Sequence, residues 1–351
     1  MVRKKKEGIS GRKSDHLLLS LSDESQNKRK GLFEDIVLLN RALPEISFSE
    51  VSSSATLLGK KVSAPVVVSS MSGGTSLSEK LNSSIARACE RLELGFSVGS
   101  QRIALENPSN RMSFEVRKFA RNAPVFANLG LASFIGGGFK PKAARDAVEM
   151  IGADGLFIHL NPAQEIVQKG GDRNFSEGTS ILEEIVDCAG VPVFAKEVGC
   201  GISGTVARRL IDAGISGLDV GGLGGTSFTK IESMRGGEEF GPALSDWGIP
   251  TLASVAECSD LPVPVIASGG LSTGVDVAKA ISLGAWGGGF AREILLANSR
   301  SGEKGIEEFL SLKIGELKAA MFLTGSKDLD SLARAEKRVF GRLSEWISQK
   351  G

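Results

Sequence analysis

Short apolar segments alternate with longer polar stretches along most of the chain. Eight segments are apolar over nearly their whole length, and most end in glycine or a polar residue: 65–71, 95–101, 125–130, 155–160, 192–197, 217–222, 264–270 and 285–291. Continuous apolar character is typical of strands that are buried on both faces, as in an all-parallel sheet. The pattern therefore predicts eight parallel strands.

The stretches between these strands have apolar residues at three- and four-residue spacing, which is typical of amphipathic helices. The clearest cover residues 78–92, 205–213 and 275–283, and the last two are followed by a glycine that would end a helix. Eight strand–helix units over roughly 260 residues favour a closed (β/α)8 barrel, or TIM barrel, over an open, doubly wound sheet. We expect residues 61–325 to form this barrel, residues 1–60 an N-terminal arm that contributes to the substrate site, and residues 326–351 a C-terminal helical extension.

The composition is unusual in glycine, histidine and tyrosine. The 351 residues include 44 glycines, close to twice the usual share of ~7%, but only 2 histidines and no tyrosine. The glycines gather just after the predicted strands, at 73–74, 136–138, 221–222, 269–270 and 287–289. Loops at the carboxyl ends of barrel strands form the active-site face, and glycine there lets backbone amides approach an anion or a flat ring.

The charge balance and the cysteines exclude several classes of protein. The 42 basic and 41 acidic side chains leave a net charge of +1, which argues against nucleic-acid binding through a basic face. No apolar run approaches the ~20 residues of a membrane span. The 4 cysteines occur singly, so neither a disulfide framework nor a zinc knuckle is expected. We expect a cytoplasmic protein without a membrane partner.

Polar residues gather at the end of the fourth predicted strand. His159 and Asn161 point to the same side because side-chain direction alternates along a strand, and Gln164 and Glu165 follow at the start of the loop. Glu165 could ligate Mg²⁺, which commonly uses one or two carboxylates together with substrate phosphate oxygens. The alternative is a hydrogen-bonded core histidine, followed by a carboxylate that opens a helix.

A lysine closes the fifth predicted strand, where its burial is costly unless the charge is paired or faces a ligand. Facing the barrel mouth, Lys196 could stabilise negative charge on a bound ring. An ion pair with Glu197 inside the barrel is the alternative.

Further cations and glycines are suited to phosphate. The loops at 267–270 and 289–292 follow the last two strands, a pair of loops that often binds phosphate in barrels. Arg12 and Lys13 in the arm could bind a polyphosphate, the arginine by paired hydrogen bonds and the lysine as a point charge. Arg102 adds a cation after the second strand.

Several of these motifs together resemble the type 2 isopentenyl diphosphate isomerases. The resemblance covers residues 11–325, and it is most specific where Arg12-Lys13-x-x-His16 occurs together with His159-Leu-Asn161-x-x-Gln164-Glu165. The other matching motifs are Met71-Ser-Gly-Gly74, Gly99-Ser-Gln-Arg102, Asn128-Leu-Gly130, Lys196-Glu-x-Gly-x-Gly-x-Ser203 and Asp219-Val-Gly-Gly-x-Gly-Gly-Thr226.

The resemblance implies an isomerase of isoprenoid biosynthesis that interconverts isopentenyl and dimethylallyl diphosphate with reduced FMN and Mg²⁺, NAD(P)H serving only to reduce the flavin. It places Gln164 at the reacting alkene, as a catalytic and substrate-binding residue, and makes Glu165 the Mg²⁺ ligand. The diphosphate would contact Arg12, Lys13, Ser100, Arg102, His159 and Asn161. FMN would be held by Ser70, Met71, Ser72, Ser100, Asn128, Lys196, Thr226, Gly270, Ala291 and Arg292. The resemblance also implies a homo-oligomer, either a tetramer or an octamer.

Three positions depart from the family's pattern. Ser72 stands where threonine is usual, Gly221 where serine is frequent, and Ser272 where arginine is frequent. With Ser272 in that position, the FMN phosphate would depend more on backbone amides or on Arg292. We expect these departures to affect the affinity for FMN rather than the type of reaction.

Other functions are possible on the same barrel. An FMN-dependent 2-hydroxy-acid oxidoreductase would need a histidine base after a late strand, yet neither histidine lies beyond residue 159. An IMP-dehydrogenase-like enzyme would need a cysteine nucleophile in the loop at 223–250, which contains none. A non-catalytic flavin- or phosphate-binding barrel is the third alternative. The chain has no tyrosine that could act as an acid, and the resemblance implies that reduced flavin exchanges protons with the alkene.

Overall fold

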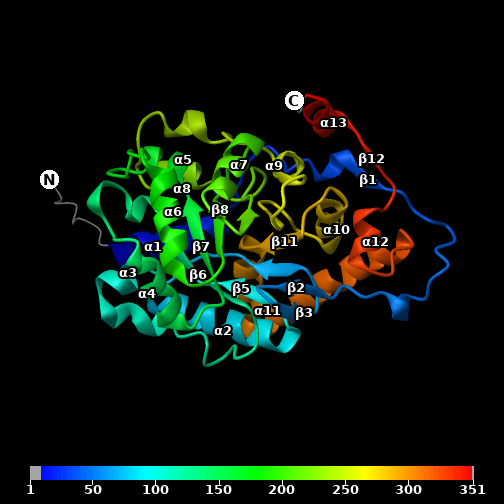
Figure 1. Ribbon diagram of the computed structural model, residues 1–351, viewed down its shortest axis with the longest axis horizontal. Helices are drawn as coiled ribbons and strands as arrows, with labels where there is room; N and C mark the ends of the chain where they lie inside the picture. Colours follow the sequence, from blue (N-terminus) through cyan, green and yellow to red (C-terminus); the bar gives the residue numbers. More distant parts are fainter. Residues whose placement is uncertain (1–8, 350–351) are drawn as a thin grey trace.

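The computed structural model describes residues 9–349, and a closed parallel barrel lies at its centre (Figure 1). The barrel strands are β4 (Val66–Val68), β5 (Gly95–Ser97), β6 (Val125–Gly130), β7 (Gly155–Leu160), β8 (Val193–Glu197), β9 (Gly217–Asp219), β10 (Val265–Ser268) and β11 (Gly287–Phe290). Each strand pairs with the next in parallel, and β11 pairs with β4 to close the sheet. The eight predicted strands and the (β/α)8 fold are confirmed, and the open sheet is excluded.

Helices connect the strands and cover the outside of the barrel (Figure 1). They are α2 (Ser76–Leu92), α3 (Arg102–Glu106), α4 (Lys142–Ile151), α5 (Pro162–Val167), α6 (Gly178–Ala189), α7 (Gly204–Asp212), α8 (Phe228–Met234), α9 (Thr251–Cys258), α10 (Gly274–Ser282) and α11 (Arg292–Leu323). The three predicted helices correspond to α2, α7 and α10. Gly214 and Gly284 follow α7 and α10 with φ values of +88° and +106°, a backbone conformation that favours glycine and ends each helix.

Three phenylalanine side chains fill the lower part of the barrel. Phe126 and Phe157 stack with ring centroids 4.2 Å apart, and Phe194 meets Phe126 edge-on at 5.2 Å. They belong to one buried cluster with Leu57 and Val62. These two residues come from a hairpin of β2 (Ala55–Leu57) and β3 (Lys60–Val62), so the hairpin closes this end of the barrel.

A layer of polar side chains lies above the phenylalanines. The register pairs His159 of β7 with Lys196 of β8, and Lys196 with Asp219 of β9. Because side chains alternate between the two faces of a strand, His159 points inward like Phe157, and Lys196 points inward like Phe194. The sheet therefore brings an imidazole, an ammonium and a carboxylate to the same level at the carboxyl end of the barrel.

The glycine triplet at 287–289 lies inside the predicted strand 285–291 and is also one of the glycine groups expected just after a strand; it forms most of β11 itself. A side chain at Gly287 would collide with the backbone carbonyl of Pro65, and one at Gly289 would lie 2.6 Å from the Ser69 hydroxyl. These glycines therefore allow close strand packing and leave room above Ser69.

The two ends of the chain meet outside the barrel. The N-terminal region contains α1 (Ile9–Leu21) and β1 (Ile36–Leu38), and the C-terminal region contains α12 (Leu329–Ala333), β12 (Lys337–Val339) and α13 (Gly341–Ser348). Figure 1 shows β1 beside β12, with which it pairs antiparallel. The C-terminal region is thus not purely helical, and the division into arm, barrel and extension stays a prediction.

Among residues 9–349, no helix combines the length and the apolar character that crossing a membrane requires.

Truncating the barrel core should destabilise the protein strongly. Phe157→Ala should lower the free energy of unfolding by about 3–5 kcal/mol, because it leaves a cavity beneath the polar layer. Urea denaturation measures this change. Phe240→Ala is the matched control, since that side chain is 44% exposed and its truncation should cost no more than about 0.5 kcal/mol. Equal losses in the two variants would contradict the assignment of Phe157 to the core.

Candidate active site

A cavity of about 250 Å³ opens at the carboxyl ends of the barrel strands. Residues from the strand–helix loops line it together with Lys13, His16 and Gln26 from the N-terminal region. Every predicted site residue except Arg12 lines this cavity: Lys13, Ser70, Met71, Ser72, Ser100, Arg102, Asn128, His159, Asn161, Gln164, Glu165, Lys196, Thr226, Gly270, Ala291 and Arg292. The side chain of Arg12 lies outside the described part of the structure. The predicted residues are therefore neighbours in space, although they come from most of the length of the chain.

Lys196 lies on the floor of the cavity and is part of a buried ion pair. Its Nζ donates to Oδ2 of Asp219 at 2.7 Å and to the Ser268 hydroxyl at 3.2 Å. Asp219 is fully buried and also accepts hydrogen bonds from the Ser268 hydroxyl and from the backbone N–H of Gly221. This network compensates the cost of burying both charges.

Lys196 does not pair with Glu197, the partner considered from sequence. Oε2 of Glu197 instead accepts the backbone N–H groups of Gly199, Cys200 and Gly201 and orders the loop after β8. Burial raises the pKa of Glu197 to about 7, although the hydrogen bonds from Cys200 and Gly199 oppose the shift. The Lys–Glu alternative is therefore wrong.

A chain of hydrogen bonds crosses the other side of the floor. The Asn128 amide donates to Ser70 Oγ at 2.9 Å, and its oxygen lies 3.0 Å from Nδ1 of His159. Nδ1 therefore donates to Asn128. Burial, followed by the positive charges of Lys196 and Lys13, lowers the pKa of His159 from its ordinary 6.5 to about 4. His159 is thus neutral near pH 7.

Helix α5 presents the residues of the fourth-strand motif to the cavity. The Asn161 amide donates to Oε1 of Glu165 at 2.9 Å and to Oε1 of Gln164 at 3.2 Å. The second oxygen of Glu165 accepts from the Gln168 side chain at 3.1 Å and from the backbone N–H of Asp172 at 2.9 Å. The orientation of the Glu165 carboxylate is therefore fixed.

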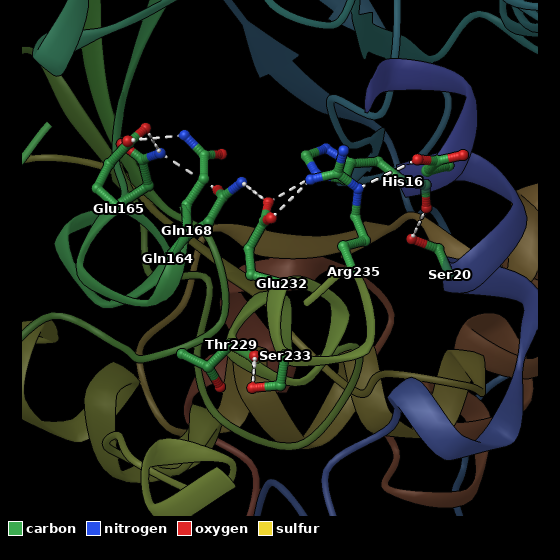
Figure 2. Close-up of polar contacts among 11 residues, drawn as sticks. His16, Ser20, Gln164, Glu165, Gln168, Thr229, Glu232, Ser233 and Arg235 are labelled. Carbon is green, nitrogen blue, oxygen red and sulfur yellow. Dashed lines mark hydrogen bonds and ion pairs between the residues drawn. The ribbon is translucent and has the colours of Figure 1, made fainter. Parts of the chain in front are cut away.

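Glu232 of α8 joins this motif to the arm, and nothing in its sequence context indicated that role. Figure 2 shows its carboxylate between Gln164 on one side and His16 and Arg235 on the other. Oε1 accepts from Gln164 at 3.1 Å and from Nε2 of His16 at 2.7 Å, and Oε2 accepts from Arg235 at 2.9 Å. Burial alone would raise the pKa of Glu232, but the bond and charge of His16, the Gln164 amide and the Arg235 charge outweigh it and lower the pKa.

These contacts fix the orientation of the Gln164 amide. Its nitrogen donates to Glu232, and its oxygen accepts from Asn161. Both polar ends of the side chain are thus held, one by Glu232 behind the cavity wall and the other by Asn161 in the wall itself.

The arm also borders the cavity near Ser100 and Thr226. Lys13 donates to the backbone carbonyl of Ser100 at 2.7 Å, and the Gln26 amide exchanges hydrogen bonds with the Thr226 hydroxyl at 3.3 Å. Arg102 bonds to Glu106 at 2.8 Å on the rim. Cations from the arm and from the β5 loop therefore lie on one side of the cavity.

The floor of the cavity and the loops at 267–270 and 289–292 are suited to a flavin. Within the described residues, the buried Ser69 hydroxyl has no hydrogen-bond partner although it lines the cavity. A side chain at Gly270 would collide with the carbonyl of Gly224, and one at Gly225 would lie 2.7 Å from the nitrogen of Gly270. This stretch of backbone can therefore face a ligand directly, and the residues present fit FMN.

The structure explains one of the three departures from the family's pattern, Gly221, and gives no reason for the other two. Gly221 has φ +46°, and a side chain there would collide with the carbonyl of Glu197, so serine would not fit this backbone. The Ser72 hydroxyl bonds to Ser78 at 2.9 Å. Ser272 bonds through its N–H to Asp276 at 3.0 Å, at the beginning of α10.

A resident metal site of several protein ligands is not formed by the described residues, which hold no group of three or more His, Cys, Asp or Glu side chains suited to a metal ion. Glu165 contributes one carboxylate, and Asn161 contributes a buried amide oxygen without a hydrogen-bond partner in the described structure. One carboxylate fits a Mg²⁺ ion that arrives with substrate phosphates.

Several cavity residues were missed or given no role from sequence. They are His16, Gln26, Ser69, Phe228, Ser268 and Glu293, with Glu232 just behind the wall. Ser268 could have been found, because it lies two residues after the inward-facing Ile266 at the end of its strand.

Solved flavoprotein structures share the fold. A lactate oxidase of Pediococcus acidilactici matches with a TM-score of 0.67 and 17% identity over 97% of each chain. A mandelate oxidase variant with (S)-mandelic acid matches with a TM-score of 0.64 and 18% identity, over 94% of this chain and 95% of the oxidase chain. These identities are too low to say more than that the architecture is shared.

Sequence relatives are more specific. The family model of FMN-dependent dehydrogenases matches residues 145–338. An isopentenyl-diphosphate delta-isomerase of Archaeoglobus fulgidus is 43% identical over 97% of this chain and 99% of its own length. An isomerase of the same name from Oceanobacillus iheyensis is 41% identical over 94% of this chain and 96% of its own length. The one from Methanothermobacter thermautotrophicus is 39% identical over 98% of this chain and 97% of its own length. With this site and these relatives, the chain belongs to the isopentenyl-diphosphate delta-isomerase family.

Proposed function

We propose that this chain interconverts isopentenyl diphosphate and dimethylallyl diphosphate, with FMN as its cofactor and Mg²⁺ bound to the substrate's diphosphate. The observation that carries the proposal is the assembly of the two most specific motifs, from the arm and from the end of β7, around one cavity. Reduction of the flavin by NAD(P)H, a cytoplasmic location and a homo-oligomeric state, as a tetramer or an octamer, belong to the same proposal.

The diphosphate would bind on the side of the cavity that carries Lys13, Ser100, Arg102, His159 and Asn161, with Arg12 added from the arm. The Lys13 ammonium lies 2.7 Å from the Ser100 carbonyl, and Arg102 lines the same wall. Charge-assisted hydrogen bonds to phosphate are stronger than neutral ones. The mixed set of cations and neutral donors thus favours an anionic group here over the alkyl part of the substrate.

Glu165 would ligate the Mg²⁺ that neutralises the diphosphate. Its carboxylate is oriented by Asn161, Gln168 and the backbone of Asp172 before any metal binds. Preorganisation of this kind lowers the entropy cost of binding.

When bound, FMN supplies the proton-exchanging group that alkene isomerisation needs. Ser70, Met71, Ser72, Asn128, Thr226, Gly270, Ala291 and the backbone of Arg292 would hold it. Lys196 would face negative charge on the ring, and the Asp219 carboxylate at 2.7 Å fixes the position of the ammonium. Gln164 would orient the alkene, since both ends of its amide are held by Glu232 and Asn161.

A 2-hydroxy-acid oxidoreductase is the alternative that the structural neighbours raise. Such an enzyme needs a histidine base beside the flavin, and the chain has only His16 and His159. His16, which belongs to the arm, bonds to Glu232 of α8, and His159 bonds to Asn128 through Nδ1. The pKa of His159, lowered to about 4, makes it a weak base, so this geometry favours the isomerase.

The first test removes the positioned amide. Gln164→Ala should lower kcat at least about 100-fold with reduced FMN and Mg²⁺, because the alkene loses its orientation. An anaerobic assay with isopentenyl diphosphate measures kcat, and FMN fluorescence confirms that the cofactor still binds. Full turnover of the FMN-loaded variant would show that Gln164 has no such role.

The second test concerns the metal. Glu165→Gln should raise the Mg²⁺ concentration for half-maximal activity at least about tenfold, since an amide is a weaker ligand than a carboxylate. Asp172→Asn is the matched control, because the Asp172 contact to Glu165 comes from the backbone N–H, which this substitution keeps. If both variants respond to Mg²⁺ like the unaltered protein, Glu165 is not the ligand.

The third test follows the protonation of His159. Its ring protons should titrate near pH 4 in NMR spectra, because burial and two lysine charges disfavour the imidazolium. Inorganic diphosphate with Mg²⁺ should raise that pKa, since a nearby anion favours the charged form. His159→Gln identifies the resonance by its loss. Titration of the free protein at or above pH 6.5 would contradict the environment described for His159.

A further inference from the structure

The helix that carries Lys13 and His16 is held against the barrel at several places, including an ion pair of Asp15 with Arg235. Lys13 bonds to Ser100 and His16 bonds to Glu232, both within the first two-thirds of α1. A further place is the carboxyl end of the helix, which contacts Arg292 at the beginning of α11. Helix α1 packs against α8 and α11, so these bonds belong to a wider contact.

Arg292 bonds to the end of this helix with its guanidinium group. Nε donates to the carbonyl of Ser20 at 3.1 Å, and Nη2 donates to the carbonyl of Leu21 at 2.9 Å. The last carbonyls of a helix have no partners within the helix, and a cation there also interacts favourably with the helix dipole. The planar guanidinium fits two adjacent acceptors in a way that an ammonium cannot.

Asp23 is a minor partner of the same guanidinium. Its carboxylate lies 2.6 Å from Nη2, but the Asp23 side chain is 97% exposed, whereas the Arg292 side chain is 17% exposed. Exposed ion pairs contribute little because water screens them. The two carbonyls of α1 are therefore the important acceptors.

The backbone and the side chain of Arg292 serve different parts of the site. Its backbone belongs to the loop at 289–292, which lines the cavity with Gly289 and Ala291. Its guanidinium is directed to α1 and is already bonded to three oxygens. A phosphate at this loop would meet backbone amides, while the arginine side chain holds the arm.

We infer that Arg292 is a positioning residue for the diphosphate: it holds the end of α1 so that Lys13 and His16 reach the cavity. This inference rests on the proposed function only in naming the diphosphate as the ligand. The alternative role, as the cation that binds the FMN phosphate, makes the opposite prediction for each variant below.

The test compares Arg292→Ala and Arg292→Lys with the control Asp23→Asn, all loaded with FMN. Both Arg292 variants should weaken binding of inorganic diphosphate with Mg²⁺ at least about tenfold, because two hydrogen bonds to a charged donor are lost. The dissociation constant of FMN should change by no more than about threefold. Isothermal titration calorimetry measures the first constant, and flavin fluorescence measures the second. Asp23→Asn should behave like the unaltered protein.

Hydrogen–deuterium exchange provides a readout that does not need turnover. Amides of α1 should exchange faster in both Arg292 variants, while those of α6 remain unchanged, because the arm loses the attachment at the carboxyl end of α1. Lysine keeps the charge but not the paired hydrogen bonds, so it should not restore α1 protection. Arg292→Lys also serves as the second variant if Arg292→Ala folds poorly, because it keeps a cation at this position.

The contrary result is equally distinct. Weaker FMN binding in Arg292→Ala that Arg292→Lys restores, with α1 exchange unchanged, would make the side chain a phosphate ligand and overturn the inference. If diphosphate binding and α1 exchange respond as expected but the unaltered protein does not isomerise isopentenyl diphosphate, the proposed function fails and the role of Arg292 stands.

Discussion

The register of the closed parallel sheet is the constraint on which the site depends. Neighbouring strands place His159, Lys196 and Asp219 at the same level, directly above inward-facing Phe157 and Phe194. Because the side-chain period of a strand is two, a shift of one residue in β8 would exchange Lys196 for Ala195 and turn the ammonium toward the helices. The phenylalanine layer holds this register, so the apolar end of the barrel determines the chemistry of the other end.

The two-residue period of strands also explains how much of the fold and the site could be predicted from the sequence. Continuous apolar segments predicted all eight strands, and the motif at the end of β7 located His159 and Gln164 correctly in the cavity. Glu232 could not be found, because its contact with Gln164 depends on how α8 and α5 pack and not on any local pattern. The sequence also could not show that the guanidinium of Arg292 is directed to the end of α1, far along the chain from its own loop. The sequence therefore predicted which residues of one strand face the cavity, but it did not predict contacts between elements that are far apart in the chain.

Two ionic networks divide the tasks of the site between rigid and attached parts. The pair of Lys196 and Asp219 lies entirely on barrel strands and is buried at the floor of the cavity. The network around Glu232 instead joins α8 to α1, which is held by side chains rather than by the sheet. One part of the cavity wall is therefore built into the barrel, and another part is completed by an element that is attached to it.

The pairing of β1 with β12 has a consequence for the order of events during synthesis. Residues 36–38 leave the ribosome long before residues 337–339, with which they pair, and α1 also precedes its partner Arg292 by most of the chain. Until those partners emerge, buried residues of the N-terminal region such as Leu17 and Ile36 remain uncovered. Long-range pairing of this kind is slow and exposes apolar surface to aggregation. A nascent chain can thus complete the site only after Arg292 and residues 337–339 have been synthesised, and until then its early segments expose apolar surface.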